Sequence, residues 1–125
     1  MTNLFDLIGR VFISLLFLIN GFLKILNYDG NIEWMESYGI SGIFLIPAII
    51  LEIAAPILIV IGYKTKVVAG LLAAFCVVTA LIFHTDFSNQ IQINSFLKNI
   101  ALAGGFLFIV ANGTQKFSLD KRKNK

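Results

Sequence analysis

Four long apolar segments constrain the fold of this chain more than any other feature. They span residues 5–26, 43–62, 67–84 and 96–112. At about 1.5 Å of rise per residue, helices of these lengths measure about 26–33 Å, close to the roughly 30 Å hydrocarbon core of a bilayer. Because backbone amides in lipid must be paired within their own segment, we predict four helices. The expected fold is an all-α, transmembrane four-helix bundle formed by one domain, residues 1–125.

The composition excludes an ordinary soluble domain. Hydrophobic residues make up 58% of the chain and charged residues 14%, against roughly 45–50% and about 25% in soluble globular proteins. A chain of 125 residues has too small an interior to hide this much apolar surface from water. Its single cysteine excludes an intrachain disulfide. One histidine, one cysteine and scattered carboxylates give no set of ligands at a useful spacing, so we predict no metal site.

The distribution of Lys and Arg predicts how the chain is oriented. The connection between the second and third segments carries Lys64 and Lys66, and the tail (residues 114–125) carries five more basic residues. The other two connections (27–42 and 85–95) carry none. Because short cytoplasmic connections are enriched in Lys and Arg, we predict that both termini are cytoplasmic and that the two long connections face outward.

The two long connections differ in their patterns. Residues 31–40 (NIEWMESYGI) carry Trp34 and Tyr38, which favour the depth of lipid head groups, so we predict a short interfacial or re-entrant helix there. The second connection alternates polar and apolar residues around Ile91 and Ile93. This alternation leaves open both a short extended lid and a plain connector.

A polar stripe follows one face of the first segment. Arg10, Ser14, Phe17, Gly21 and Lys24 are spaced by four, three, four and three residues. Residues at these spacings lie on the same side of a helix. We therefore expect this face to point into the bundle rather than at lipid.

Glu52 lies near the middle of the second segment and is the most informative single residue. A carboxylate at the bilayer centre costs at least about 2.5–3.5 kcal/mol on insertion scales, so it must be paired, protonated or hydrated. One interpretation is a structural ion pair with Arg10, although Arg10 can instead extend its guanidinium to the head groups. The other is a catalytic, proton-handling or ligand-binding carboxyl group.

A second polar group is expected near the outer ends of the helices. It comprises Asn20, Lys24, His84, Lys98 and Asn99. With Glu52 below them, these side chains would form a basic pocket that suits an anionic or carbonyl-bearing ligand, such as a quinone head group. A histidine there can exchange protons near neutral pH. Taken singly, each of these residues is also explained by hydration at a helix end.

Several short motifs occur in a fixed order along the chain. They are Gly9-Arg10, Gly21-x-x-Lys24, Trp34–Gly39, Glu52 with Gly62, Lys98-Asn99, Gly113 and Phe117-Ser118-Leu119-Asp120. In this order and at this spacing, they resemble the DoxX family of small four-helix membrane proteins over almost the whole chain.

The resemblance implies a compact multi-pass protein of a bacterial inner membrane. The family takes its name from a subunit associated with quinone-linked oxidoreductases, and some members look like accessory parts of redox complexes. The resemblance therefore implies a quinone-interacting or accessory subunit, with a quinone as the only bound cofactor and with redox subunits or a second copy as protein partners. In this hypothesis Glu52 handles a proton, Lys24, Lys98 and Asn99 hold ligand oxygens, and Arg10 sets the charge balance.

Two other hypotheses remain open. A small proton-coupled transporter would also have four helices and one membrane carboxylate, although drug transporters of that kind place the carboxylate in the first helix. A purely structural membrane protein would use Arg10 and Glu52 as an internal clamp.

Overall fold

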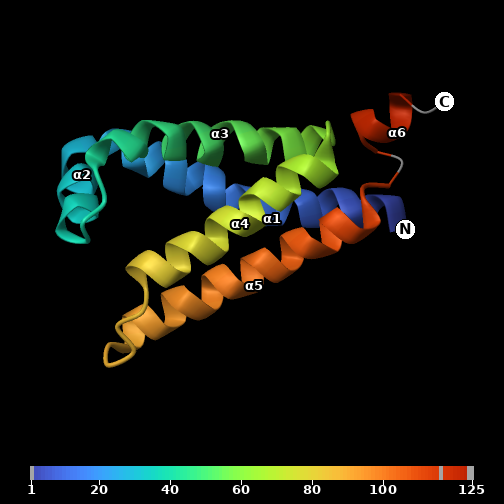
Figure 1. The fold of residues 1–125 in the computed structure, drawn as a ribbon. Coiled ribbons are helices and arrows are strands. Elements are labelled where there is room, and N and C mark those ends of the chain that lie inside the picture. The colour runs from blue at the N-terminus through green and yellow to red at the C-terminus, as the bar shows by residue number, and fades with distance from the viewer. Residues whose placement is uncertain (1, 116, 124–125) are drawn as a thin grey trace.

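The computed structural model describes residues 2–115 and 117–123, and in these residues it contains helices and no strand (Figure 1). The elements are α1 (Thr2–Leu26), α2 (Tyr28–Ser37), the 3-10 turn η1 (Gly42–Phe44), α3 (Leu45–Ile61), α4 (Thr65–Phe83), α5 (Gln90–Asn112) and α6 (Leu119–Lys123). The predicted all-α fold class is confirmed.

Four of the helices are long and apolar enough to cross a membrane: α1, α3 together with η1, α4 and α5. They coincide with the four predicted segments, but α5 begins six residues earlier, at Gln90. The side chain of Asn89 accepts a hydrogen bond from the Ile91 amide (2.9 Å), which caps this earlier start. Both alternatives for residues 90–95, an extended lid and a plain connector, are therefore wrong.

The helices pack as two antiparallel pairs, α1 with α3 and α4 with α5. In Figure 1 the pairs lie close together near the two chain ends and diverge toward α2 and the turn between α4 and α5. The start of α1 and the end of α5 thus lie on the same side of the bundle, as an even number of spans requires (Figure 1). Which side faces the cytoplasm stays a prediction.

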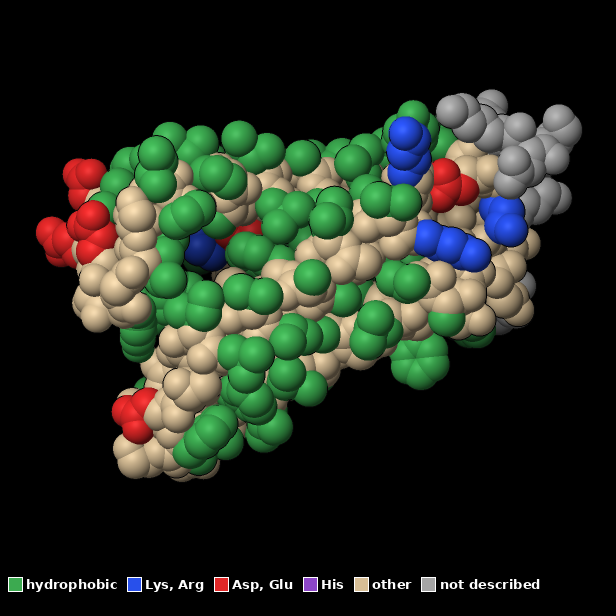
Figure 2. All heavy atoms as spheres, in the orientation of Figure 1, with side chains coloured by type: hydrophobic (Ala, Val, Ile, Leu, Met, Phe, Trp, Pro, Cys, Tyr) green, Lys and Arg blue, Asp and Glu red, His purple; other side chains and the backbone are tan. Residues whose placement is uncertain are grey.

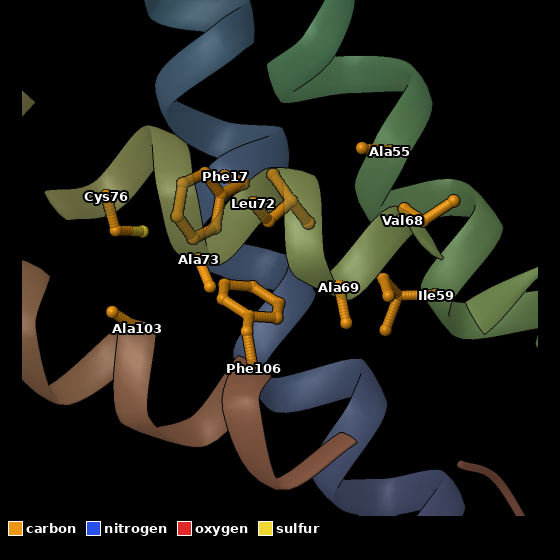
Figure 3. Packing of buried hydrophobic residues seen from close by; sticks show 10 residues of the cluster. All are labelled: Phe17, Ala55, Ile59, Val68, Ala69, Leu72, Ala73, Cys76, Ala103 and Phe106. Atoms are coloured by element: carbon orange, nitrogen blue, oxygen red, sulfur yellow. The ribbon is translucent and has the colours of Figure 1, made fainter. Parts of the chain in front are cut away.

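The core lies where the two pairs meet (Figure 3). The Phe17 ring of α1 meets the Phe106 ring of α5 edge to face, with 5.5 Å between the ring centroids. Arg10, Ser14, Phe17 and Gly21 are buried, so α1 turns the predicted stripe into the bundle. A Cβ atom added at Gly21 would lie 3.2 Å from the Glu52 Cβ, which shows how closely α1 approaches α3 at that level.

The outer surface of the bundle is apolar, as a lipid-facing surface must be. Phe12 of α1 and Phe108 of α5 are 71% and 73% exposed. Figure 2 shows apolar side chains along the middle of the molecule and charged side chains at its two ends.

The predicted helix in the first long connection is present as α2. The Trp34 ring of α2 stacks on Phe83, at the end of α4, with 4.5 Å between their centroids, and Tyr38 contacts the same ring edge to face. These contacts connect α2, which follows α1 in sequence, to the opposite helix pair. Its position at a membrane interface stays a prediction.

Candidate functional site

A cavity of about 230 Å³ is lined by residues of all five of the longer helices, α1 to α5, and most of its lining is apolar. Its polar lining includes every residue of the predicted pocket: Asn20, Lys24, Glu52, His84, Lys98 and Asn99. The structure therefore brings these six residues to one place.

An ion pair between two helices lies in this cavity. Lys24 Nζ of α1 donates to Glu52 Oε1 of α3 over 2.8 Å. The Glu52 side chain is 4% exposed and that of Lys24 27% exposed. The second carboxylate oxygen, Glu52 Oε2, is buried and has no hydrogen-bond partner among the described residues. In Figure 2 a basic and an acidic side chain are visible in a hollow of the apolar middle of the molecule.

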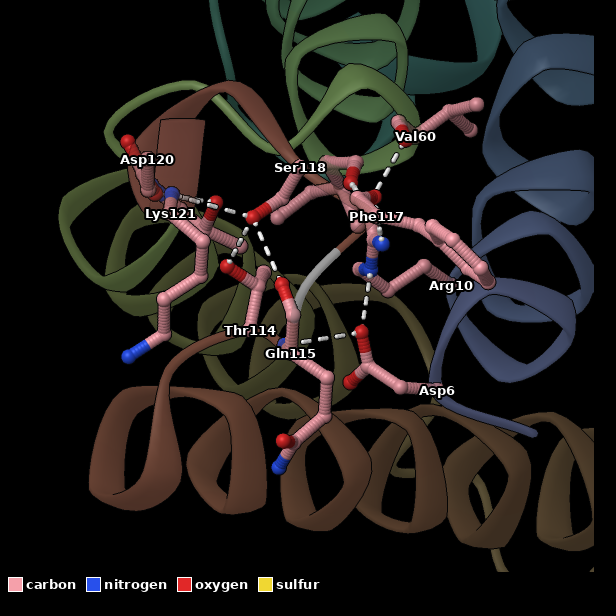
Figure 4. Close-up of polar contacts among 11 residues, drawn as sticks. Asp6, Arg10, Val60, Thr114, Gln115, Phe117, Ser118, Asp120 and Lys121 are labelled. Atoms are coloured by element: carbon pink, nitrogen blue, oxygen red, sulfur yellow. Dashed lines mark hydrogen bonds and ion pairs between the residues drawn. The ribbon is translucent and has the colours of Figure 1, made fainter. Parts of the chain in front are cut away.

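The predicted ion pair between Arg10 and Glu52 is wrong. Arg10 is 2% exposed, which also excludes an extension to the head groups. Its guanidinium donates to Asp6 Oδ2, to the carbonyl oxygens of Ile59 and Val60, and to that of Phe117 (Figure 4). Arg10 thus lies about two helical turns, roughly 11 Å, from Glu52 along α3.

The end of α3 explains where Arg10 binds. The last four carbonyl groups of a helix have no partner within the helix and carry the negative end of its dipole. α3 ends at Ile61, and Gly62 follows in the left-handed conformation (φ 75°). Arg10 donates 3.0 and 2.7 Å hydrogen bonds to the Ile59 and Val60 carbonyl oxygens. The guanidinium therefore caps this helix end instead of pairing with the acid in the cavity.

The other polar residues of the cavity are held to different extents. Asn99 Nδ2 donates to Thr79 Oγ1 over 3.2 Å, and His84 Nδ1 shares a 2.9 Å hydrogen bond with Gln92 Oε1. Lys98 is exposed and has no hydrogen-bond or ion-pair partner within the described part of the chain. The cavity thus offers, in addition to the Lys24–Glu52 pair, an ammonium group that no described residue binds by a hydrogen bond or ion pair.

Several residues of the site are not predicted from the sequence. Thr79 has the one hydroxyl group in segment 67–84, and a lone polar group in an apolar segment is a signal that it faces the bundle interior. Gln92 was assigned to a connection, so its hydrogen bond with His84 could not be foreseen. Trp34 is predicted at head-group depth, and the structure adds that it lines the cavity.

The arrangement suits the binding of a small amphipathic molecule. An apolar lining can enclose a ring, whereas Lys98, Asn99 and the free oxygen of Glu52 supply donors and an acceptor. Among the described residues, no three His, Cys, Asp or Glu side chains lie close enough together to hold a metal ion.

The sequence profile of the DoxX family matches residues 5–85. The chain belongs to the DoxX family. The match covers α1 to α4 and therefore includes Lys24, Glu52 and His84, whereas Lys98 and Asn99 lie beyond it.

Relatives match this DoxX-family chain over nearly its whole length. It is 34% identical to inner membrane protein YqjF of Escherichia coli strain K12, over 95% of this chain and 92% of that protein. It is 37% identical to inner membrane protein YphA of the same strain, over 93% and 88%. It is also 30% identical to the Surfeit locus protein 4 homolog of Schizosaccharomyces pombe strain 972, over 95% of this chain but 37% of that longer protein. No solved structure matches significantly.

Together with the four helices able to span a bilayer, these matches show an integral membrane protein of the DoxX family.

Proposed function

We propose that this DoxX-family protein binds a quinone head group in the cavity and acts as a quinone-interacting or accessory subunit of a membrane oxidoreductase. The names of its bacterial relatives favour an inner membrane location, and the basic tail favours cytoplasmic termini. The observation that carries the proposal is the buried Lys24–Glu52 pair, whose Oε2 atom lacks a partner among the described residues.

The cavity has the size and chemistry for such a head group. Its volume of about 230 Å³ exceeds that of the roughly 150 Å³ cavity that holds a benzene ring in another protein. The ring would contact the apolar lining, in which Phe75 and Leu102 take part. Lys98 and Asn99 can donate hydrogen bonds to carbonyl oxygens, since the Lys98 ammonium group is not engaged by any described residue.

The charged pair adds a means of handling protons. A bound quinone takes up two electrons and two protons when it is reduced, and in this proposal a partner subunit supplies the electrons. Glu52, ionised in the pair, takes up one proton at Oε2, the oxygen that Lys24 does not occupy, and passes it to the quinone, and water supplies the second proton. Lys24 compensates the charge of Glu52 after that proton is transferred.

The experiment uses a reporter already present in the chain. Trp34 is the single tryptophan and lines the cavity, so its fluorescence reports on a quinone bound nearby. The protein is reconstituted into lipid nanodiscs and titrated with a short-chain benzoquinone. We expect saturable quenching in the wild-type protein and weaker binding in Glu52→Gln and Lys98→Met.

The matched control is Glu36→Gln, because Glu36 lies on α2 but is exposed and outside the cavity lining. It is expected to bind as the wild type does. Quenching that rises linearly without saturation, or that is equal in all four proteins, would refute quinone binding at this site.

A further inference from the structure

Basic side chains gather where α3 ends and α4 begins, beside the C-terminal segment (residues 113–115 and 117–123). Lys64, Lys66 and Lys121 are all exposed. Figure 2 shows basic groups at this end of the molecule next to an acidic one, and acidic groups at the other end, over α2 and the turn between α4 and α5. The charge of the molecule is therefore polarised along its helices.

Hydrogen bonds hold the C-terminal segment against the helices at this end. Asp120 Oδ1 accepts from the Lys64 amide (2.7 Å), and Oδ2 accepts from the Thr65 amide (2.9 Å) and hydroxyl (2.6 Å). The Asp120 amide donates to the Gly62 carbonyl over 2.8 Å. Because Asp120 satisfies the free amides at the start of α4, it fixes the segment in one position.

The neighbouring residues are fixed in the same way (Figure 4). The Lys121 amide donates to Ser118 Oγ, which itself is hydrogen-bonded to Thr114. Lys66 lies against Gly113, since a Cβ atom added at Gly113 would lie 3.1 Å from the Lys66 Cε. The three lysines are thus attached to a rigid frame rather than to a loose tail.

We propose that this basic cluster, Lys64, Lys66 and Lys121, binds the phosphate groups of anionic phospholipids. The cluster lies at the ends of two spanning helices, which is the depth of lipid head groups. Basic groups that directly adjoin a spanning helix attract anionic lipids. The sequence adds four more basic residues, whose side chains lie outside the described part: Lys116, Arg122, Lys123 and Lys125.

The test measures which lipids the protein retains. Purified protein is mixed with phosphatidylglycerol and phosphatidylcholine in mild detergent, and native mass spectrometry counts the bound molecules of each. The wild-type protein is expected to prefer phosphatidylglycerol. In the double variant Lys64→Gln/Lys66→Gln, the preference for phosphatidylglycerol over phosphatidylcholine is expected to be about tenfold weaker at low ionic strength.

A charge-matched control separates a local site from the overall charge. The variant Thr85→Glu/Asn94→Glu lowers the net charge by the same amount at two exposed residues of the acidic end. It is expected to keep the wild-type preference. Equal losses in the two double variants, or no loss in either, would overturn the proposal.

Asp120→Ala tests whether the rigid frame matters. This variant gains net positive charge, so attraction to a loose basic tail predicts stronger retention of phosphatidylglycerol. A basic cluster held in place by Asp120 predicts weaker retention of phosphatidylglycerol at unchanged helix content. Stronger retention would overturn the proposal. In a last arm, inorganic phosphate is added as competitor, and full displacement of the lipid would identify a site for free phosphate instead.

Discussion

Lys24 and Glu52 are the residues whose contact most affects both stability and binding. Their side chains meet at 2.8 Å between α1 and α3, in a part of the molecule that lipid surrounds. A buried charge that loses its partner costs far more than the pair contributes, because its desolvation is no longer offset. The contact therefore predicts opposite outcomes for single and double substitutions.

Lys24→Met is expected to destabilise the protein by about 3 kcal/mol, because it leaves Glu52 without its partner. Lys24→Met/Glu52→Leu is expected to recover most of this loss, since no buried charge remains. Thermal unfolding in mild detergent measures both. Additive losses in the double variant would show that the two residues act independently.

Arg10→Lys is expected to lower stability by about 2 kcal/mol although it keeps the charge. An ammonium group cannot reach the Ile59, Val60 and Phe117 carbonyl oxygens as the planar guanidinium does. The C-terminal segment should then become sensitive to protease in reconstituted protein. A matched control is Lys121→Arg, which should leave both properties unchanged. Unaltered protection of the segment in Arg10→Lys would contradict this role.

At the scale of elements, the point of closest approach between α1 and α3 determines where along these helices the site lies. Gly21 lies at the contact, where an added Cβ would be 2.8 Å from the Ile53 side chain and 3.2 Å from the Glu52 Cβ. A contact of 2.8 Å requires either the Ile53 side chain or one of the two helices to shift. The small residue thus allows Lys24, one turn further along α1, to reach Glu52.

Gly21→Ala is expected to destabilise the bundle by about 1–3 kcal/mol and to weaken quenching of Trp34 by quinone. Gly9→Ala, on the same helix, is the control, because no atom lies within 4 Å of its added Cβ. It should be neutral, or stabilising by up to about 1 kcal/mol. Equal effects of the two changes on unfolding temperature would show that α1 and α3 tolerate a methyl group at their contact.

The aromatic contacts of α2 hold it over the end of α4. Phe83→Ala removes the ring on which Trp34 stacks, so we expect faster hydrogen exchange in α2. Phe87→Ala is the matched control, since its ring pairs with Phe96 and, among the described residues, makes no ring contact with Trp34 or Tyr38. Unchanged exchange in α2 after Phe83→Ala would show that other contacts hold this helix.

At the scale of the whole molecule, charge and helix ends together predict orientation. Acidic groups lie over α2 and the α4–α5 turn, and basic groups lie at the opposite end with both described chain ends (Figures 1 and 2). The enrichment of Lys and Arg in cytoplasmic connections therefore predicts that the basic end faces inward.

Cysteine labelling tests this orientation. In a Cys76→Ala background, Ser88→Cys places a thiol in the α4–α5 turn and Gln115→Cys places one beside the basic end. An impermeant maleimide added to intact cells should label Ser88→Cys alone. Labelling of Gln115→Cys alone would reverse the predicted orientation.

The sequence by itself determined the number of helices able to span the membrane, their approximate ends and six polar residues of the cavity. Apolar segments of membrane-spanning length can satisfy their amides only as helices, and polar residues at similar depth must avoid lipid by meeting one another. For this reason sequence depth alone predicts that Asn20, Glu52 and Asn99 share one site, and all three line the cavity.

Only the tertiary structure decided which charged groups pair. The spacing of residues predicts their depth along a helix. It does not predict how one helix is rotated relative to another, nor which side chain binds the free carbonyl groups at a helix end. Arg10 therefore binds the end of α3, and Lys24 is left to pair with Glu52. The early start of α5 was hidden for a similar reason, because alternation in residues 90–95 resembles a strand until packing and the Asn89 cap select a helix.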